Sequence, residues 1–85
     1  MSKIEIGISD DYAVLDTEQF KFYYGYERTA NNDEWCFTVE QAKTRHEVCR
    51  FTTSYLIEKC PDLKRRDEPF LFLTVGMNLY FEMDK

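Results

Sequence analysis

The sequence predicts an α+β domain in which an antiparallel sheet of about five to six strands packs against one long helix. Three observations carry this prediction: strand-like alternation over residues 4–8 and 20–27, helical periodicity over 39–59, and an apolar run over 70–75. The expected element order is ββββ-α-ββ. Because the chain has only 85 residues, we expect a single domain that spans residues 1–85.

The first part of the chain is expected to form an antiparallel meander of short strands. Isoleucine occupies every second position from 4 to 8, which is typical of a half-buried strand. The segment 9–11 reads Ser-Asp-Asp and supplies turn chemistry, because short oxygen-bearing side chains bond their own backbone. Residues 12–15 form the next strand and 34–37 the fourth. The third strand carries aromatic residues on one face: Phe20, Phe22, Tyr24 and Tyr26.

A long helix is predicted from about Val39 to Lys59. Residues 38–41, Thr-Val-Glu-Gln, match a capping box, in which two side chains satisfy the first backbone donors of a helix. Pro61 disfavours helical backbone at Cys60 and so ends the helix. One apolar stripe of this helix faces the sheet, and a second patch lies on the opposite side: Val48, Phe51 and Tyr55. Either a loop such as 61–69 covers this patch or it forms a dimer seam.

Two further strands are expected after the charged connector 62–69. They cover residues 70–75 and 79–83 and are joined through Gly76 and Met77. Glycine at the first central position suits a type II′ hairpin. Since residues 70–73 are apolar on both faces, this strand is expected inside the sheet.

The charge of the chain is negative and unevenly distributed. Its 16 acidic and 11 basic residues give a net charge of −5. Residues 1–40 hold nine acidic and three basic residues, and residues 41–85 hold seven and eight, so the negative charge belongs to the front half. Because Lys and Arg supply most affinity for phosphates, we expect no direct binding of nucleic acid. A basic protein surface is the better partner.

Cysteine usage and the amino terminus indicate a cytoplasmic protein. The three cysteines, Cys36, Cys49 and Cys60, form no close pair, and residues 1–5 lack the pattern of a signal peptide. We therefore expect free thiols in a reducing compartment. The longest apolar run, 70–75, is far below the roughly 20 residues that span a bilayer, so no membrane association is expected.

No catalytic or metal-binding constellation stands out. His46 and Cys49 would lie one turn apart on the predicted helix, with Cys36 and Cys60 as further ligands for a metal. Structural zinc sites usually take ligands as close pairs in turns, whereas these residues occur singly on an apolar stripe. Nucleophilic catalysis would use the same His46 and Cys49, which are expected to face the core. We expect no enzyme, no metal and no cofactor.

A contact surface for a protein partner is expected on the first three strands. Tyr23 falls on the polar face of its strand, and tyrosine supplies rigid amphipathic contact area at interfaces. Ordinary cross-strand pairing is the alternative explanation for such an aromatic residue. The candidate contacts combine Tyr23 with the front-half acids: Asp10, Asp11, Asp16, Glu18, Tyr23 and Glu27.

The opening segments resemble the start of small early-operon accessory proteins of P2-like temperate phages. The similarity lies in residues 4–7, Ile-Glu-Ile-Gly, and in 12–14, 20–22 and 27–29. It implies a bacterial cytoplasm and a non-enzymatic protein that binds and inhibits a host or defence protein, as anti-CRISPR and anti-restriction factors do. The alternative is a small homo-oligomeric assembly or adaptor module that uses the helix patch of Val48, Phe51 and Tyr55, or an exposed edge strand.

Overall fold

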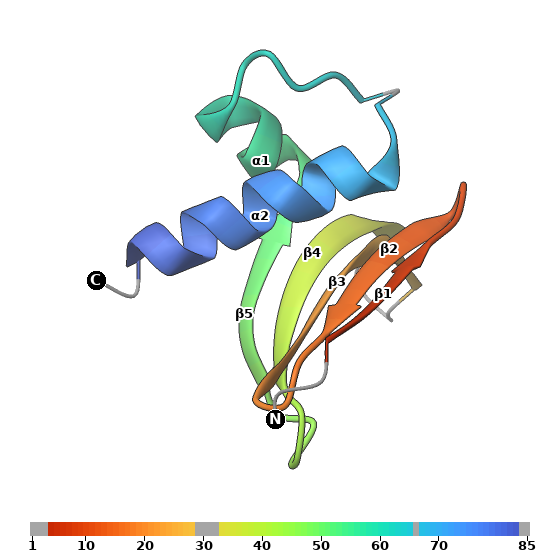
Figure 1. The fold of residues 1–85 in the computed structure, drawn as a ribbon. Helices are drawn as coiled ribbons and strands as arrows, with labels where there is room; N and C mark the ends of the chain where they lie inside the picture. The colour runs from red at the N-terminus through yellow and green to blue at the C-terminus, as the bar shows by residue number, and fades with distance from the viewer. Residues whose placement is uncertain (1–3, 29–32, 66, 84–85) are drawn as a thin grey trace.

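The computed structural model describes residues 4–28, 33–65 and 67–83 and shows an α+β fold (Figure 1). Its elements follow in the order β1 (Glu5–Ile8), β2 (Tyr12–Asp16), β3 (Phe20–Arg28), β4 (Asp33–Gln41), β5 (Glu47–Thr52), α1 (Thr53–Lys59) and α2 (Pro69–Met83). The five strands form one antiparallel sheet in sequence order, and α2 packs on one face of it. The predicted fold class is therefore confirmed.

The predicted meander of the front half is present as β1, β2 and β3. Ser9 Oγ accepts hydrogen bonds from the backbone N–H groups of Asp11 and Tyr12, which fixes the first turn. Thr17 does the same for the second turn through Phe20 N–H at 3.0 Å. The aromatic alternation along β3 is present and places Phe22 and Tyr24 in the core, whereas Tyr26 of the same set is exposed.

The predicted helix over residues 39–59 is wrong for most of its length. Residues 39–41 continue β4, 47–52 form β5, and only 53–59 are helical as α1. Cross-strand pairing explains the apolar pattern, because Val39 lies opposite Cys49 and Phe37 opposite Phe51. The expected capping box is also wrong. The Gln41 side chain accepts a hydrogen bond from the Thr44 hydroxyl in the β4–β5 turn.

The predicted hairpin over residues 70–83 is also wrong, because these residues form α2. The long helix of the fold is thus at the carboxyl end of the described chain rather than in the middle. Pro69 suits the first helical position, where its missing N–H removes no bond. Gly76 is required by close packing rather than by a turn: a Cβ added there would lie 2.5 Å from Phe37 Cδ1, and closer still to Cγ.

Aromatic residues of the sheet and of both helices build the core. The rings of Phe22 and Phe51 stack on opposite sides of Phe37, at centroid distances of 6.5 Å and 5.8 Å. Leu63 of the connector between the helices is also buried against this cluster. Within the described residues, neither helix is long and apolar enough to cross a membrane.

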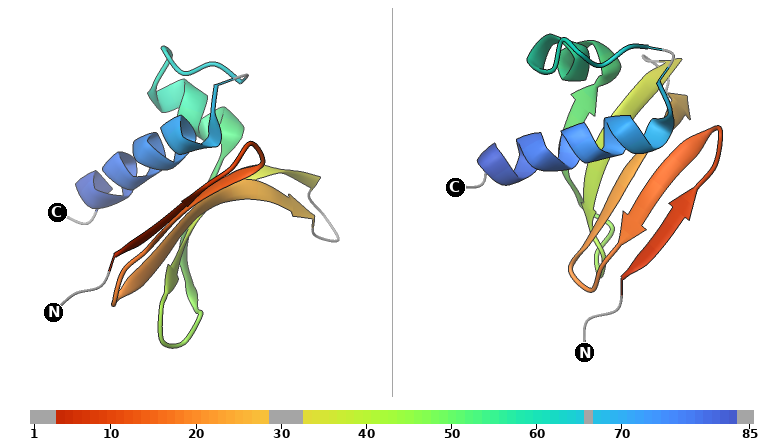
Figure 2. Two further views of the ribbon diagram at one scale, coloured as in Figure 1. Left: turned by 45° about the vertical axis from the view of Figure 1, so that its right-hand side comes forward. Right: turned by 45° about the horizontal axis from the view of Figure 1, so that its top comes forward.

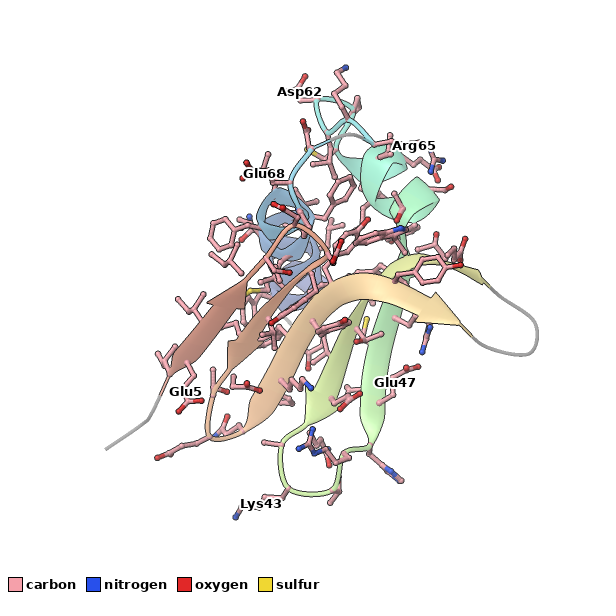
Figure 3. All side chains as sticks on the ribbon, turned by 90° about the vertical axis from the view of Figure 1, so that its right-hand side faces the viewer. Glu5, Lys43, Glu47, Asp62, Arg65 and Glu68 are labelled. Carbon is pink, nitrogen blue, oxygen red and sulfur yellow. The ribbon has the colours of Figure 1, made fainter. Side chains whose placement is uncertain are left out.

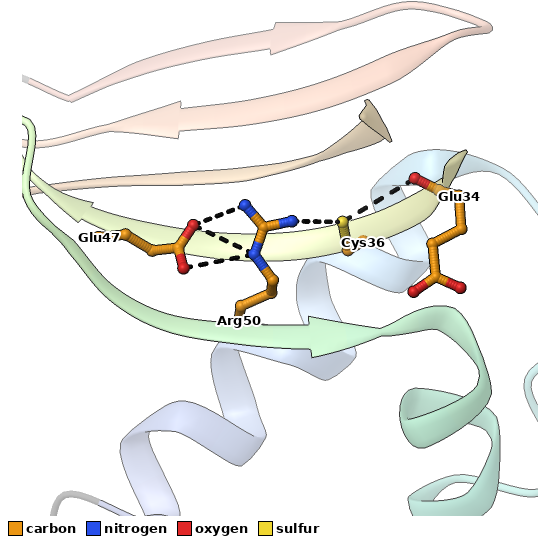
Figure 4. A network of polar contacts seen from close by, with 4 residues as sticks. All are labelled: Glu34, Cys36, Glu47 and Arg50. Atoms are coloured by element: carbon orange, nitrogen blue, oxygen red, sulfur yellow. Dashed lines mark hydrogen bonds and ion pairs between the residues drawn. The ribbon is translucent and has the colours of Figure 1, made fainter. Parts of the chain in front are cut away.

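The sheet is strongly curved, and its other face is not covered by a helix (Figure 2). This face holds a small polar network on β4 and β5 (Figure 4). The Arg50 guanidinium lies 2.7 Å from the Glu47 carboxylate and donates to Cys36 Sγ at 3.2 Å. Cys36 is only 2% exposed, so the guanidinium acts as part of the cover of this central strand.

Candidate functional site

The predicted partner contacts are spread over both ends of β2 and over β3. Asp10 and Asp11 lie in the turn before β2, whereas Asp16 is the last residue of β2 and Glu18 lies in the turn that follows. The five residues of β2 separate the two groups by about 17 Å at 3.4 Å per residue. Glu27 belongs to β3, but its side chain lies outside the described part of the structure.

Tyr23 takes part in cross-strand packing on the helix-free face of the sheet. Its ring stacks on that of Tyr12 at a centroid distance of 6.1 Å, and Lys21 Nζ lies 5.6 Å from the ring centroid. Tyr23 is half-buried in this arrangement. The alternative explanation, ordinary pairing between strands, therefore accounts for the Tyr23 position.

The three residues of the predicted dimer seam do not share one exposed face, because Phe51 packs on Tyr55 in the core whereas Val48 is exposed. Phe51 is only 7% exposed and stacks on Phe37 and on Tyr55, so it belongs to the core. Val48 is 45% exposed on β5. The prediction that Val48, Phe51 and Tyr55 share one face of a helix is wrong, because residues 47–52 form a strand.

A cleft lies at one end of the sheet, where five segments meet. These are the β1–β2 turn, the end of β3 with the start of β4, the start of α1, the connector between the helices, and the start of α2. In Figure 3, Arg65 and Glu68 mark this end of the molecule and Lys43 marks the opposite end. The cleft encloses about 500 Å³ and is lined by Asp10, Tyr24, Glu34, Trp35, Thr53, Ser54, Arg65, Asp67, Pro69 and Phe72.

Aromatic rings form the apolar part of this cleft. Tyr24 stacks on Phe72 at a centroid distance of 4.7 Å and on Trp35 at 5.8 Å, and Tyr26 meets Trp35 edge-on at 6.0 Å. Tyr24 and Phe72 are buried, whereas Trp35 is half-buried and borders solvent. Trp35 is the only tryptophan of the sequence.

Hydrogen bonds hold the aromatic wall in place. The Thr53 hydroxyl donates to the backbone oxygen of Trp35 at 2.7 Å, so the Tyr24 hydroxyl is the donor in its 2.8 Å contact with Thr53 Oγ1. Burial raises the pKa of Tyr24 above its ordinary value, although the Thr53 hydrogen bond lowers it. The Tyr24 hydroxyl therefore stays protonated at neutral pH and keeps this donor role.

Carboxylates outnumber basic groups in the lining. Among the lining residues that the structure describes, Asp10, Glu34 and Asp67 come from three different segments and Arg65 is the one basic side chain, so these four residues carry a formal charge of −2. Arg65 donates to Ser54 Oγ at 3.1 Å, and Asp67 accepts from the Lys64 N–H at 2.8 Å. Among the described residues, none of the three carboxylates forms an ion pair. An aromatic wall beside carboxylates is an environment that suits a cation.

A second, smaller cleft continues this acidic region. It encloses about 420 Å³, shares Asp10, Asp67 and Pro69 with the first, and adds Ile8, Ser9 and Glu68. The turn before β2 and the connector before α2 thus present their acids side by side. Among the described lining residues, acids therefore outnumber basic groups in both clefts.

Most residues of the cleft escaped prediction from the sequence. Asp10 was among the predicted contacts, but Asp67 was expected only as part of the charged connector 62–69, and Glu34 and Trp35 as part of the fourth strand. The lining comes from positions scattered between 10 and 72, and no motif spacing connects them. The one sequence signal that pointed to the aromatic side of the cleft was the high content of aromatic residues in 20–37.

The side chains considered for metal binding or catalysis lie elsewhere. His46 is exposed in the β4–β5 turn and Cys49 is half-buried on β5, where burial raises its pKa. In residues 4–28, 33–65 and 67–83, no group of three or more His, Cys, Asp or Glu side chains is placed to hold a metal ion.

Comparison with protein-family models, with curated proteins and with solved structures found no match for this chain.

Proposed function

We propose that this protein is a non-enzymatic binding module that captures a basic protein partner, with a Lys or Arg side chain of the partner inserted into the cleft at the acidic end of the sheet. One observation carries the proposal: three carboxylates and one arginine line a cleft whose wall is the Trp35–Tyr24–Phe72 aromatic stack. In the phage setting that the resemblance implies, such a partner would be a host or defence protein that handles nucleic acid.

The chemistry of the lining favours a guanidinium over an ammonium group. A guanidinium is planar, stacks on an aromatic face and donates two parallel hydrogen bonds to a carboxylate. Trp35 provides the exposed ring, and Glu34 is its neighbour on β4. A cation over a solvent-exposed ring contributes about 0.5–1 kcal/mol, and each exposed ion pair about 0.2–1 kcal/mol. Several such contacts are needed for useful affinity, which agrees with a lining drawn from five segments.

The charge of the whole chain adds long-range attraction. A net charge of −5 accelerates encounter with a basic surface and makes the association sensitive to salt. A basic site that normally binds nucleic acid phosphates would be attracted by the same field. Competition with nucleic acid is thus the expected means of inhibition.

Binding of a synthetic arginine-rich peptide tests this proposal. Fluorescence anisotropy of the labelled peptide is measured at low and at high salt, with a glutamate-rich peptide of equal length as control. The double variant Asp10→Asn, Glu34→Gln should weaken binding by about 2- to 30-fold, because each lost exposed pair is worth roughly 1.4- to 5-fold. Glu18→Gln removes one exposed carboxylate at the opposite end of β2 and is the matched control for each single variant, Asp10→Asn or Glu34→Gln, which is measured beside the double variant.

The two arms of this experiment have opposite meanings. Selective loss in the cleft variant, with relief by high salt, supports the proposal. A loss of affinity in Glu18→Gln that equals the loss in either single cleft variant would mean that only net charge matters. Binding unaffected by salt would contradict the electrostatic mechanism.

A further inference from the structure

We infer that β1 forms an interface between two copies of this chain, in which the two β1 strands pair antiparallel with Ile6 opposite Ile6. In the described structure, β1 lies at one end of the strand order and pairs only with β2. This interface lies along the sheet edge; it shares no residue with the lining of the acidic cleft that contains Trp35, and only Ile8 with the second, smaller cleft.

The backbone groups that face the open edge belong to the isoleucines. The turn bond from Ser9 N–H to Tyr12 O, at 2.9 Å, marks these two residues as a hydrogen-bonded pair. Hydrogen-bonded and non-hydrogen-bonded pairs alternate in an antiparallel ladder, so Gly7 and Glu5 bond toward β2. The N–H and C=O groups of Ile6 and Ile8 therefore point away from β2, and continuation of the pattern adds Ile4.

The side chains of the same residues form an exposed apolar row. Ile4, Ile6 and Ile8 are 61%, 60% and 57% exposed. Ile6 and Ile8 lie opposite Leu15 and Ala13, on the helix-bearing face of the sheet. α2 packs on β2 and β3, which leaves the isoleucines at the edge uncovered. An exposed apolar edge strand favours pairing with another strand.

The segment is complementary to itself. Residues 4–8 read Ile-Glu-Ile-Gly-Ile, so a two-fold axis at Ile6 places Ile4 opposite Ile8 of the second copy. The outward-facing backbone groups then meet in hydrogen-bonded pairs, and Glu5 lies opposite Gly7. A two-fold axis at Glu5 would instead oppose two like charges, which destabilises a strand pair. Because the segment matches itself in this way, we infer that the partner of β1 is the β1 strand of a second copy.

The opposite edge of the sheet differs from β1. β5 has a register irregularity against β4 at Val39/Glu40 and carries the charged residues Glu47 and Arg50. Bulges and charges are the usual devices that prevent pairing at an edge. In residues 4–8 the single charge is Glu5, and the backbone pairs with β2 without an irregularity. Only β1 therefore has the character of an interface.

Salt is expected to have opposite effects on this interface and on the binding of a basic partner. Two copies that each carry a net charge of −5 repel each other, so screening by salt strengthens the dimer. Salt weakens the complex with a basic peptide, as argued above. The two proposals can therefore fail independently.

Mass in solution, measured by light scattering over a range of protein concentrations, tests the interface. The expected result is a rise from 10.2 kDa toward twice that mass, which is more complete at high salt. Ile6→Lys should keep the protein monomeric over the whole range. Val48→Lys is the matched control, because Val48 is an exposed apolar residue on the other edge strand.

Amide hydrogen exchange of the unmodified protein gives a second readout that does not depend on any variant. In the dimer, the Ile6 and Ile8 amides should become protected as the concentration rises, whereas the Gly7 amide is protected throughout. A mass of 10.2 kDa at every concentration would overturn the interface. So would a dimer that survives Ile6→Lys, or fast exchange at Ile6 and Ile8 in a dimeric sample.

Discussion

Replacement of Gly76 by alanine tests the packing of α2 on the sheet. At an exposed position inside a helix, this change stabilises a protein by about 1 kcal/mol, because alanine has the higher helix propensity. Gly76 is buried, and its added Cβ would lie 2.5 Å from Phe37 Cδ1 and 2.8 Å from Cδ2. The Phe37 ring has no room to withdraw, since it is fully buried between Phe22 and Phe51.

The expected magnitude follows from these two opposing effects. Overpacking in a core costs about 1–3 kcal/mol, and the gain in helix propensity offsets about 1 kcal/mol of it. We therefore expect Gly76→Ala to lower the free energy of unfolding by up to about 2 kcal/mol. For a domain of this size, a loss of 2 kcal/mol corresponds to a decrease in Tm of about 8–16 °C.

Urea unfolding followed by far-UV circular dichroism measures this change. Asn78→Ala, at an exposed position of the same helix, is the control for propensity and should stabilise the protein slightly. In a Phe37→Leu background, Gly76→Ala should cost less, because the smaller side chain leaves room for the methyl group. A gain of about 1 kcal/mol in the unmodified background would refute the close packing of α2 on Phe37.

Three further predictions concern the buried polar groups. Thr53→Val should lower the free energy of unfolding by about 1–3 kcal/mol in a chemical denaturation assay, because it leaves the buried Tyr24 hydroxyl without its acceptor. Since burial raises the pKa of Tyr24 above 10.0, the folded state binds this proton more tightly than the unfolded state. Stability should therefore fall as pH rises above 10, at a rate of up to about 1.4 kcal/mol per pH unit, and Tyr24→Phe should remove that part of the fall. An unchanged pH profile in Tyr24→Phe would contradict the assignment. Cys36, at 2% exposure, should react with iodoacetamide only on unfolding, which mass spectrometry of the alkylated protein can detect; rapid labelling of the native protein would argue against its burial under Arg50.

The front half of the fold was predictable because its signals are local. Alternation along β3 and the Ser-Asp-Asp turn each depend on a few adjacent residues, and the β1–β2–β3 meander follows from them. Residues 39–59 were misassigned because a strand, a turn and another strand also placed apolar residues at helical spacings. The cross-strand pairs Val39–Cys49 and Phe37–Phe51, which explain this pattern, connect positions too far apart for a local reading.

The misassigned end of the chain has a different cause. Residues 70–73 are all apolar, and periodicity alone does not distinguish a buried strand from a buried helix in such a short run. Gly76 was interpreted as a turn residue, although its role is to let α2 approach Phe37. The cleft could not be predicted from the sequence either, since Asp10, Glu34 and Asp67 become neighbours only after the sheet, the connector and α2 have assembled.

Trp35 fluorescence gives the most direct test that the acidic cleft receives a cationic side chain. Trp35 lines the cleft and is the only tryptophan of the chain, so its emission reports on this site. Titration with N-acetylarginine amide should change the emission of the unmodified protein and of Glu18→Gln, and should have a much smaller effect on Asp10→Asn, Glu34→Gln. An emission spectrum that does not respond to the arginine derivative at low salt, or that responds equally in the cleft variant, would contradict the assignment of this cleft as the binding site.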